Sequence, residues 1–308
     1  MASNLVQLLD ERIKITSWIN SVLYGSIEVR ERKYKKYIYV HYRDGKKLVT
    51  KYAGGYSSRL VNIILENTLL AKELKKRLNR VNKQLKKLNY CEKEISSNVK
   101  TSIKYINNNL TNVIYNMIKM DDLDLNYDDL DLLVKEDVIS NMKVEYANRI
   151  NNLKSAWNFV LNKDVINTDL SFDLLSQINN LIDFNFSYNA GKLRRIPLQI
   201  ENSSYIPSIP FENLVNSSLQ QILKNKGKSL DKALNLFVYL QKNLIFTNSN
   251  LETSIVIVNH YLVKNGLGML YIPYVLKDDY NKKLLNLYEW NEEEQLKEFL
   301  LKNCYFEK

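Results

Sequence analysis

The segment from Leu236 to Pro273 constrains the fold more than any other part of the chain, because two helical patterns flank a short polar loop there. The apolar positions of the second pattern recur at steps of four and three residues: Leu251, Ile255, Val258 and Leu262. This spacing predicts a helix from about 251 to 264 that begins at the loop Thr247–Asn250. Free N–H groups and the positive dipole end meet at a helix start, so the loop is a candidate anion site, although most such loops are only caps.

The same segment resembles the core motif of the Fic (Fido) family, H-x-F-x-(D/E)-G-N-(G/K)-R-(T/S), and the family's following helix. That helix ends in a segment such as ANHYLIKNGLGILSIP, and this chain reads VNHYLVKNGLGMLYIP from Val258 to Pro273. Phe246, Asn250 and Thr253 stand at their motif positions. The resemblance implies a fold whose members typically transfer AMP, and in some cases other phosphate-containing groups, from a nucleotide to a protein hydroxyl.

The motif positions that carry the family's chemistry have changed. Leu244 stands at the catalytic histidine, Asn248 at the Mg²⁺-binding acid, Ser249 at the first glycine and Glu252 at the phosphate-binding arginine. Leucine cannot accept a proton, and losing a general base typically costs about 10²- to 10⁴-fold in rate. A carboxylate about 4 Å from a phosphate is repelled by roughly 4 kcal/mol at an effective dielectric of about 20.

The remaining motif residues have roles that need no catalysis. Asn250 is expected to maintain the loop through hydrogen bonds from its side chain to the backbone. His260 lies two turns into the helix and His41 in a distant hairpin, so neither is placed as a substitute base. His260 is expected to be a satisfied core or surface residue.

Upstream, the segment Ala190–Val215 resembles the family's flap, a strand pair that lies over the target peptide and is entered through a glycine-and-arginine turn. The flap residues implied by the resemblance are Lys192, Arg194, Arg195 and Tyr205. The resemblance covers roughly residues 140 to 290. The predicted fold is therefore mainly α, a Fic-type helical domain with a small β-hairpin flap.

Many Fic proteins also carry an inhibitory helix with the pattern (S/T)-x-x-x-E-(G/N), whose glutamate pairs with the motif arginine. The nearest segment here is Tyr115–Met120, which puts Lys119 at the glutamate position. Lys119 and Glu252 form a hypothetical reversed ion pair. The following stretch Asp121–Asp137 is acidic but lacks the glycine and the final glutamate of a calcium loop, so no metal site is expected.

Charged residues are unevenly distributed along the chain. Residues 1–100 hold 22 Lys and Arg against 9 Asp and Glu, whereas residues 101–308 hold 22 against 25. This predicts a basic N-terminal region, 1–100, and a Fic-like domain, 101–308. Within the N-terminal region, alternating residues around Asp44-Gly45 predict a β-hairpin over 30–52, and a basic amphipathic helix is expected over 57–90.

This hairpin and helix resemble the N-terminal extension of bacterial Fic proteins and the DNA-contacting arm of phage-type integrases. The candidate contacts to a phosphate backbone are Lys33, Lys35, Lys36, Arg43, Lys46, Lys47 and Lys51. The alternative interpretation is a solvated basic face that packs beside an acidic partner.

Three functions therefore remain open. The first is a catalytically degenerate Fic-fold protein that binds a protein or a nucleic acid, with no cofactor expected. The second is an active nucleotidyltransferase with a non-standard site, using ATP and Mg²⁺. The third is a DNA-binding regulator that works through residues 30–90, with the Fic domain as a platform for homo-oligomers.

The remaining sequence features indicate where the protein is expected to work and in what kind of genome. Apolar runs are interrupted by charge, no signal peptide is visible at Met1, and Cys91 and Cys304 match no metal or redox spacing, so a cytoplasmic protein with no membrane partner is expected. The scarcity of Gly and the abundance of Asn and Lys suit an AT-rich bacterial or phage genome and a toxin–antitoxin or phage setting.

Overall fold

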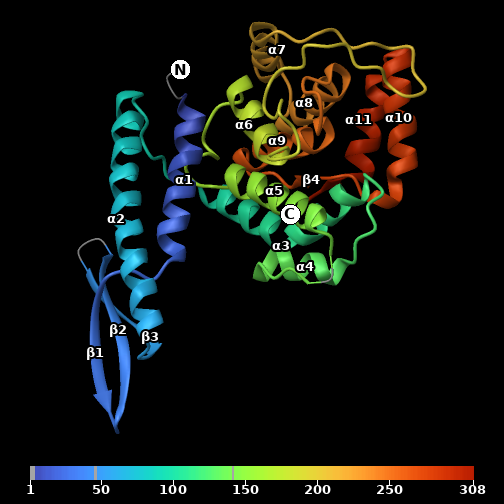
Figure 1. The fold of residues 1–308 in the computed structure, drawn as a ribbon. Helices are drawn as coiled ribbons and strands as arrows, with labels where there is room; N and C mark the ends of the chain where they lie inside the picture. Colours follow the sequence, from blue (N-terminus) through green and yellow to red (C-terminus); the bar gives the residue numbers. More distant parts are fainter. Residues whose placement is uncertain (1–3, 45–46, 141) are drawn as a thin grey trace. The chain divides into compact units, whose positions relative to one another are not determined.

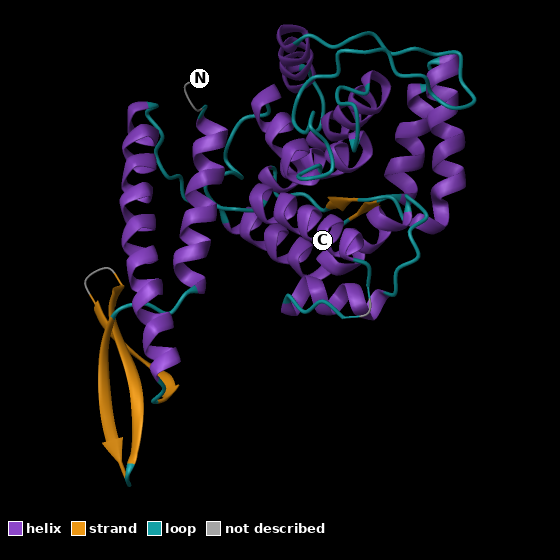
Figure 2. Cartoon of the chain, in the orientation of Figure 1, coloured by secondary structure: helices purple, strands orange, loops and turns teal. Residues whose placement is uncertain are grey.

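The computed structural model describes residues 4–44, 47–140 and 142–308, which fall into two compact units, Met1–Cys91 and Glu92–Lys308 (Figure 1). The division lies before the boundary at residue 100 that charge predicts, because residue 100 is already inside the first helix of the second unit. Figure 2 shows that strands dominate one end of the first unit and that helices make up most of the second.

The first unit is a helix, a three-stranded antiparallel sheet and a long helix. Its elements are α1 (Leu5–Ser21), β1 (Ser26–Arg32), β2 (Lys35–Asp44), β3 (Lys47–Gly55) and α2 (Ser58–Lys87). The strand order is β1-β2-β3, and α1 packs against α2. The predicted long helix over 57–90 is therefore present, with Ser57 as its N-cap.

The region predicted to be a two-stranded hairpin over 30–52 belongs to a sheet of three strands. A turn at Lys33 and Tyr34 divides the segment expected to be a single strand, and β1 and β2 pair on either side of it. Gly45 and Lys46, between β2 and β3 in the sequence, lie outside the described residues.

The second unit is built around one buried helix. Its elements in chain order are α3 (Ser97–Lys119), α4 (Tyr127–Glu136), α5 (Val144–Val160), α6 (Phe172–Ile182), α7 (Glu212–Lys224), α8 (Ser229–Asn243), α9 (Asn250–Lys264), β4 (Met269–Leu270), η1 (Tyr274–Leu276), α10 (Lys277–Trp290), α11 (Glu293–Asn303) and β5 (Tyr305–Phe306). Helix α9 packs against α3, α5, α6 and α8, and every side chain from Thr253 to Val263 is buried. A helix that is buried on all sides is the centre of the domain.

Asn259 and His260 of α9 make hydrogen-bonding contacts inside this core, although the Nδ1 of His260 has no partner among the described residues. Asn259 accepts a hydrogen bond from the backbone N–H of Leu270 at 2.9 Å and donates to its carbonyl at 2.6 Å, which fixes β4 against the helix. His260 is fully buried, and its Nε2 contacts the carbonyl oxygen of Val165 at 3.1 Å. Burial lowers the pKa of His260 to about 4, so the ring is neutral at physiological pH.

The mainly α fold is confirmed, with small antiparallel sheets in both units. The flap, however, is not a strand pair: from Lys192 to Pro207 the described chain is irregular and forms no ladder. Pro197 and Pro207 have no N–H to donate, and side chains bind several of the segment's backbone groups instead.

No described helix is both long enough and apolar enough to cross a lipid bilayer.

Candidate functional site

The loop between α8 and α9 is closed by one asparagine. The side chain of Asn250 accepts a hydrogen bond from the Phe246 N–H at 3.0 Å and donates to the Phe246 carbonyl at 2.8 Å. Leu244 and Ser249 take left-handed conformations at the two ends, with φ of 42° and 52°. The backbone therefore reverses direction sharply between the two helices, as the motif predicts, without any glycine in the loop.

Asn179 of α6 supports the same loop from the side. It is buried, and its Nδ2 donates to the Asn248 carbonyl at 3.1 Å and to the Thr253 hydroxyl at 3.2 Å. Its Oδ1 accepts from the backbone N–H of Gly191 at 2.8 Å. A Cβ at Gly191 would lie 2.7 Å from a carbonyl oxygen of α6, so only glycine allows this approach.

Arg194 ties the flap to the end of α8. Its backbone N–H donates to the Ile245 carbonyl at 3.0 Å, and its fully buried guanidinium group donates to a ring of carbonyl oxygens. The acceptors within 3.2 Å belong to Leu244, Ile196, Pro207 and Ser208.

No described carboxylate pairs with Arg194, and burial lowers its pKa. Its charge is instead balanced by carbonyl dipoles, including those at the negative end of α8. Arg194 is therefore a structural anchor and not a surface residue of the flap.

The other predicted flap residues have different surroundings. Tyr205 stacks on Tyr288 with ring centroids 5.5 Å apart, and Lys192 donates to the Tyr188 carbonyl at 2.9 Å. Arg195 is exposed. The tip of the flap is fixed by Glu289, a residue that the motif comparison did not single out.

The carboxylate of Glu289 accepts hydrogen bonds from the Ser203 hydroxyl and from the Ser204 N–H, the latter at 2.7 Å. The Ser203 hydroxyl bond is the leading cause that lowers the pKa of Glu289, followed by the Ser204 backbone bond. The flap is therefore an irregular loop that Arg194 holds near its start and Glu289 holds at Ser203 and Ser204.

Glu252 lies in the first turn of α9, where the family has an arginine, and faces charged groups from three other elements. Burial, together with the nearby carboxylates of Asp121 and Asp183, raises its pKa to about 7. The N–H of Glu252 itself and the cation of Arg149 act in the opposite direction. The carboxyl group is thus placed at the positive end of the helix, where an anion would otherwise bind.

The neighbours of Glu252 are paired with each other. Arg149 of α5 forms an ion pair with Asp121 at 2.7 Å, and the Ser249 hydroxyl donates to Asp183 at 2.6 Å. Burial raises the pKa of Asp183, an effect that the Ser249 hydrogen bond partly offsets. Arg149 and Asp183 could not be predicted from the motif, because neither residue belongs to it.

The reversed ion pair between Lys119 and Glu252 is not formed among the described residues. The Nζ of Lys119 lies 5.7 Å from the ring centroid of Tyr274, and the cation near Glu252 is Arg149. Lys119 is the last residue of α3, whereas Arg149 lies in the second turn of α5.

The space left between these groups is small. A cavity of about 20 Å³ lies beside Ser249 and Glu252 and is bordered by Asp121, Arg149 and Asp183. This volume is enough for about one water molecule, whereas ligand pockets typically measure about 300–1,000 Å³.

These residues do not fit Mg²⁺ and ATP. Leu244 supplies no proton acceptor, Asn248 supplies a neutral side chain where a divalent cation prefers a carboxylate, and Glu252 repels phosphate. The arrangement can hold a closed loop.

The predicted phosphate contacts of the first unit lie on both faces of its sheet. By strand register, Lys35 and Arg43 share one face, and Lys36, Lys47 and Lys51 share the opposite one. The remaining two candidates differ in position: Lys33 lies in the β1–β2 turn, and Lys46 lies outside the described residues.

No family model matches the sequence, and no curated protein matches it significantly. Solved structures are similar in fold. A fragment of Fic-1 from C. elegans has a TM-score of 0.53 at 15% identity and covers 80% of this chain and 73% of that one. A Fic domain containing signaling protein from Bacteroides thetaiotaomicron has a TM-score of 0.52 at 17% identity, and the match covers 61% of this chain and 81% of that one.

A point variant of the same Fic-1 fragment has a TM-score of 0.51 at 13% identity, and the match covers 80% of this chain and 74% of that one. Identities this low show the fold and nothing further. The Fic fold expected from the motifs is confirmed.

Proposed function

We propose that this Fic-fold chain is catalytically degenerate and acts by binding a protein partner, without transferring a nucleotide. The observation that carries the proposal is the position of Glu252. Its carboxyl group lies at the N-terminus of α9 beside a cavity of about 20 Å³, where a nucleotide phosphate would need positive charge and space.

The supporting contacts favour a structural role for the loop. Asn250 and Arg194 use their side-chain hydrogen bonds to hold backbone groups, and Asn179 holds two backbone groups and the Thr253 hydroxyl. The fold has kept the scaffold of the site while the groups that perform proton transfer and phosphate binding have been replaced.

We place the binding surface on the flap. The described segment from Lys192 to Pro207 is irregular and forms no ladder, and it exposes apolar side chains at Ile196 and Ile206, which are 60% and 61% exposed. An extended peptide can add to such a segment through main-chain hydrogen bonds and fill gaps between its side chains. The anchors Arg194 and Glu289 hold the segment in one conformation beforehand, which lowers the entropic cost of binding.

A transfer assay tests the degenerate site. The intact chain and the variant L244H/N248D/S249G/E252R are incubated with Mg²⁺ and ATP labelled at the α-phosphate, and label on protein is measured. The proposal predicts no incorporation by the intact chain. Incorporation by the intact chain would replace the proposal with the active-transferase interpretation.

A peptide-display selection tests the flap. Random peptides enriched on the intact chain should lose binding to Ile206→Lys and keep it with Ile139→Lys, a matched control whose side chain is 57% exposed elsewhere in the same unit. Equal binding to both variants would contradict docking at the flap.

A further inference from the structure

The two faces of the sheet in the first unit carry different side chains. Ile38 and Val40 of β2 turn toward α2 and are fully buried against Ile64. The alternate residues of β2, Tyr37 and Tyr39, therefore occupy the opposite face together with their partners on β1 and β3. The face that carries these tyrosines is called the tyrosine face below.

Three tyrosines meet on this face. The ring centroid of Tyr52 on β3 lies 5.5 Å from that of Tyr39 and 6.3 Å from that of Tyr37, and the rings are tilted by 57° and 51°. Tyr52 is 55% exposed. An open groove of about 650 Å³ is lined by Tyr37, Tyr39, Tyr52, Arg32 and Lys33.

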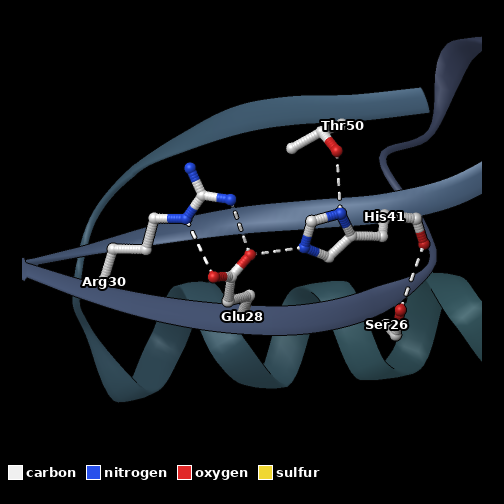
Figure 3. Close-up of polar contacts among 5 residues, drawn as sticks. All are labelled: Ser26, Glu28, Arg30, His41 and Thr50. Atoms are coloured by element: carbon white, nitrogen blue, oxygen red, sulfur yellow. Dashed lines mark hydrogen bonds and ion pairs between the residues drawn. The ribbon is translucent and has the colours of Figure 1, made fainter. Parts of the chain in front are cut away.

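A polar network beside the groove holds an arginine over one of these rings. Glu28 accepts hydrogen bonds from the Nε and Nη2 of Arg30, both at 2.9 Å, and contacts the Nε2 of His41 at 2.7 Å (Figure 3). The other ring nitrogen of His41 contacts the Thr50 hydroxyl at 2.8 Å. The guanidinium carbon of Arg30 consequently lies 4.5 Å from the ring centroid of Tyr39.

Arg30 keeps part of its donor capacity. Figure 3 shows the second terminal nitrogen of Arg30 pointing away from Glu28. The hydrogen bonds from Arg30 and then from His41 lower the pKa of Glu28 to about 2, so the Glu28 carboxylate that holds Arg30 is ionised at every physiological pH. Glu28 is a positioning residue that fixes a planar cation beside an aromatic surface.

The hairpin tip next to the groove is conformationally costly. Lys33 and Tyr34 both have positive φ, 46° and 62°, and Tyr34 is completely exposed. A bulky side chain rarely adopts this conformation, and such residues concentrate at binding sites. The tip presents one further cation and one further aromatic ring at the end of the groove.

We infer that the tyrosine face binds single-stranded nucleic acid, with unpaired bases stacked on Tyr37, Tyr39 and Tyr52 and the phosphate backbone held by Arg32 and Lys33. Aromatic rings interleaved with cations in an open groove are the arrangement that single-stranded nucleic acid binds. The inference does not depend on the function proposed for the Fic-fold unit.

Charge favours this ligand over an apolar peptide. Residues 1–91 hold 20 Lys and Arg against 7 Asp and Glu, a net charge of +13, and none of the described residues that line the groove is acidic. A proline-rich peptide also binds aromatic grooves but brings no charge to balance this excess. A duplex hides the faces of its bases in its own stack, so tyrosine stacking favours an unpaired strand.

Fluorescence anisotropy on the full chain tests the inference. Dye-labelled 12-mers of deoxythymidine and of uridine are titrated beside a duplex of the same length, at two salt concentrations, with a proline-rich peptide and polyglutamate as competitors. The two single strands distinguish DNA from RNA. We expect a single strand to bind more tightly than the duplex, and neither competitor to displace it at equal concentration.

Variants separate stacking from general electrostatic attraction. Tyr52→Ala should weaken single-strand binding by roughly 5- to 160-fold, the range reported for loss of one stacked base, and Tyr52→Trp should retain it. Tyr56→Ala is the matched control, because Tyr56 is 50% exposed in the same unit and does not line the groove. Arg32→Gln and Lys33→Gln should each reduce the salt slope by about 0.7.

Circular dichroism melts of each variant verify folding, and Arg32→Gln provides an independent test if Tyr52→Ala unfolds. The inference is overturned by any of three results: no binding of either single strand by the intact chain, tighter binding of the duplex, or equal affinities for Tyr52→Ala and Tyr56→Ala. Displacement by the proline-rich peptide or by polyglutamate would reassign the groove to a protein ligand.

Discussion

Replacing Arg194 by methionine is expected to destabilise the Fic-fold unit strongly. The guanidinium group donates to four carbonyl oxygens within 3.2 Å and is fully buried. Hydrogen bonds from a charged group contribute about 1.5–3 kcal/mol each, so four of them give a gross stabilisation of roughly 6–12 kcal/mol. Burying an unpaired cation costs several kcal/mol, so the net loss of unfolding free energy should be about 3–5 kcal/mol.

Urea unfolding can measure this loss in one unit alone. Trp157 is fully buried in the Fic-fold unit, whereas Trp18 and Trp290 are 51% and 75% exposed. Their replacement by phenylalanine leaves Trp157 as the only fluorescent indole, so the transition reports on its surroundings.

The neighbour of Arg194 provides the control. Arg195 has the same side chain and is exposed, so Arg195→Met should change the unfolding free energy by less than about 0.5 kcal/mol. Arg194→Lys should fall between the two, because lysine keeps the charge and loses the planar fork of donors. Equal unfolding midpoints for Arg194→Met and Arg195→Met would refute the anchoring role.

Three further predictions concern titration and the flap. The raised pKa of Glu252 means that its stability contribution is complete below pH 4.5 and is lost as pH rises through about 7. Glu252→Gln should therefore match the intact chain at pH 4.5 and exceed it by about 3 kcal/mol in unfolding free energy at pH 8, and a constant difference would contradict this. The lowered pKa of His260 has the opposite effect, so unfolding free energy should fall by about 3 kcal/mol between pH 6.5 and pH 4, and His260→Gln should lack that part of the decrease. Glu289→Ala frees Ser203 and Ser204, so trypsin should cleave after Arg195 severalfold faster than in the intact chain, and an unchanged rate would contradict the account of the flap.

The loop and its helix could be predicted from sequence because their determinants are local. The spacing of apolar residues identifies α9, and the motif position of Asn250 predicts the side-chain bridge that closes the loop. What lies beside Glu252 could not be predicted, because Asp121, Arg149 and Asp183 come from separate segments that only the packed fold brings together. The hypothesis of a Lys119 pair failed for the same reason.

The flap and the sheet show a second limit of prediction from sequence. Two adjacent arginines look alike in sequence, and only the fold determines that Arg194 is buried while Arg195 is exposed. Strand β1 has few apolar residues, and its turn at Lys33 and Tyr34 contains neither glycine nor asparagine, so no turn signal separated it from β2. Such positions are the ones at which local propensity is overruled, and they border the groove proposed to bind nucleic acid.

The most direct test of the central claim is isothermal titration calorimetry of Mg²⁺ and ATP with the intact chain and with Glu252→Arg. The account predicts no binding heat for the intact chain and weak binding for the variant, because the variant replaces repulsion at the α9 N-terminus with attraction. Clear binding of ATP by the intact chain would contradict the claim that Glu252 and its neighbours close the site.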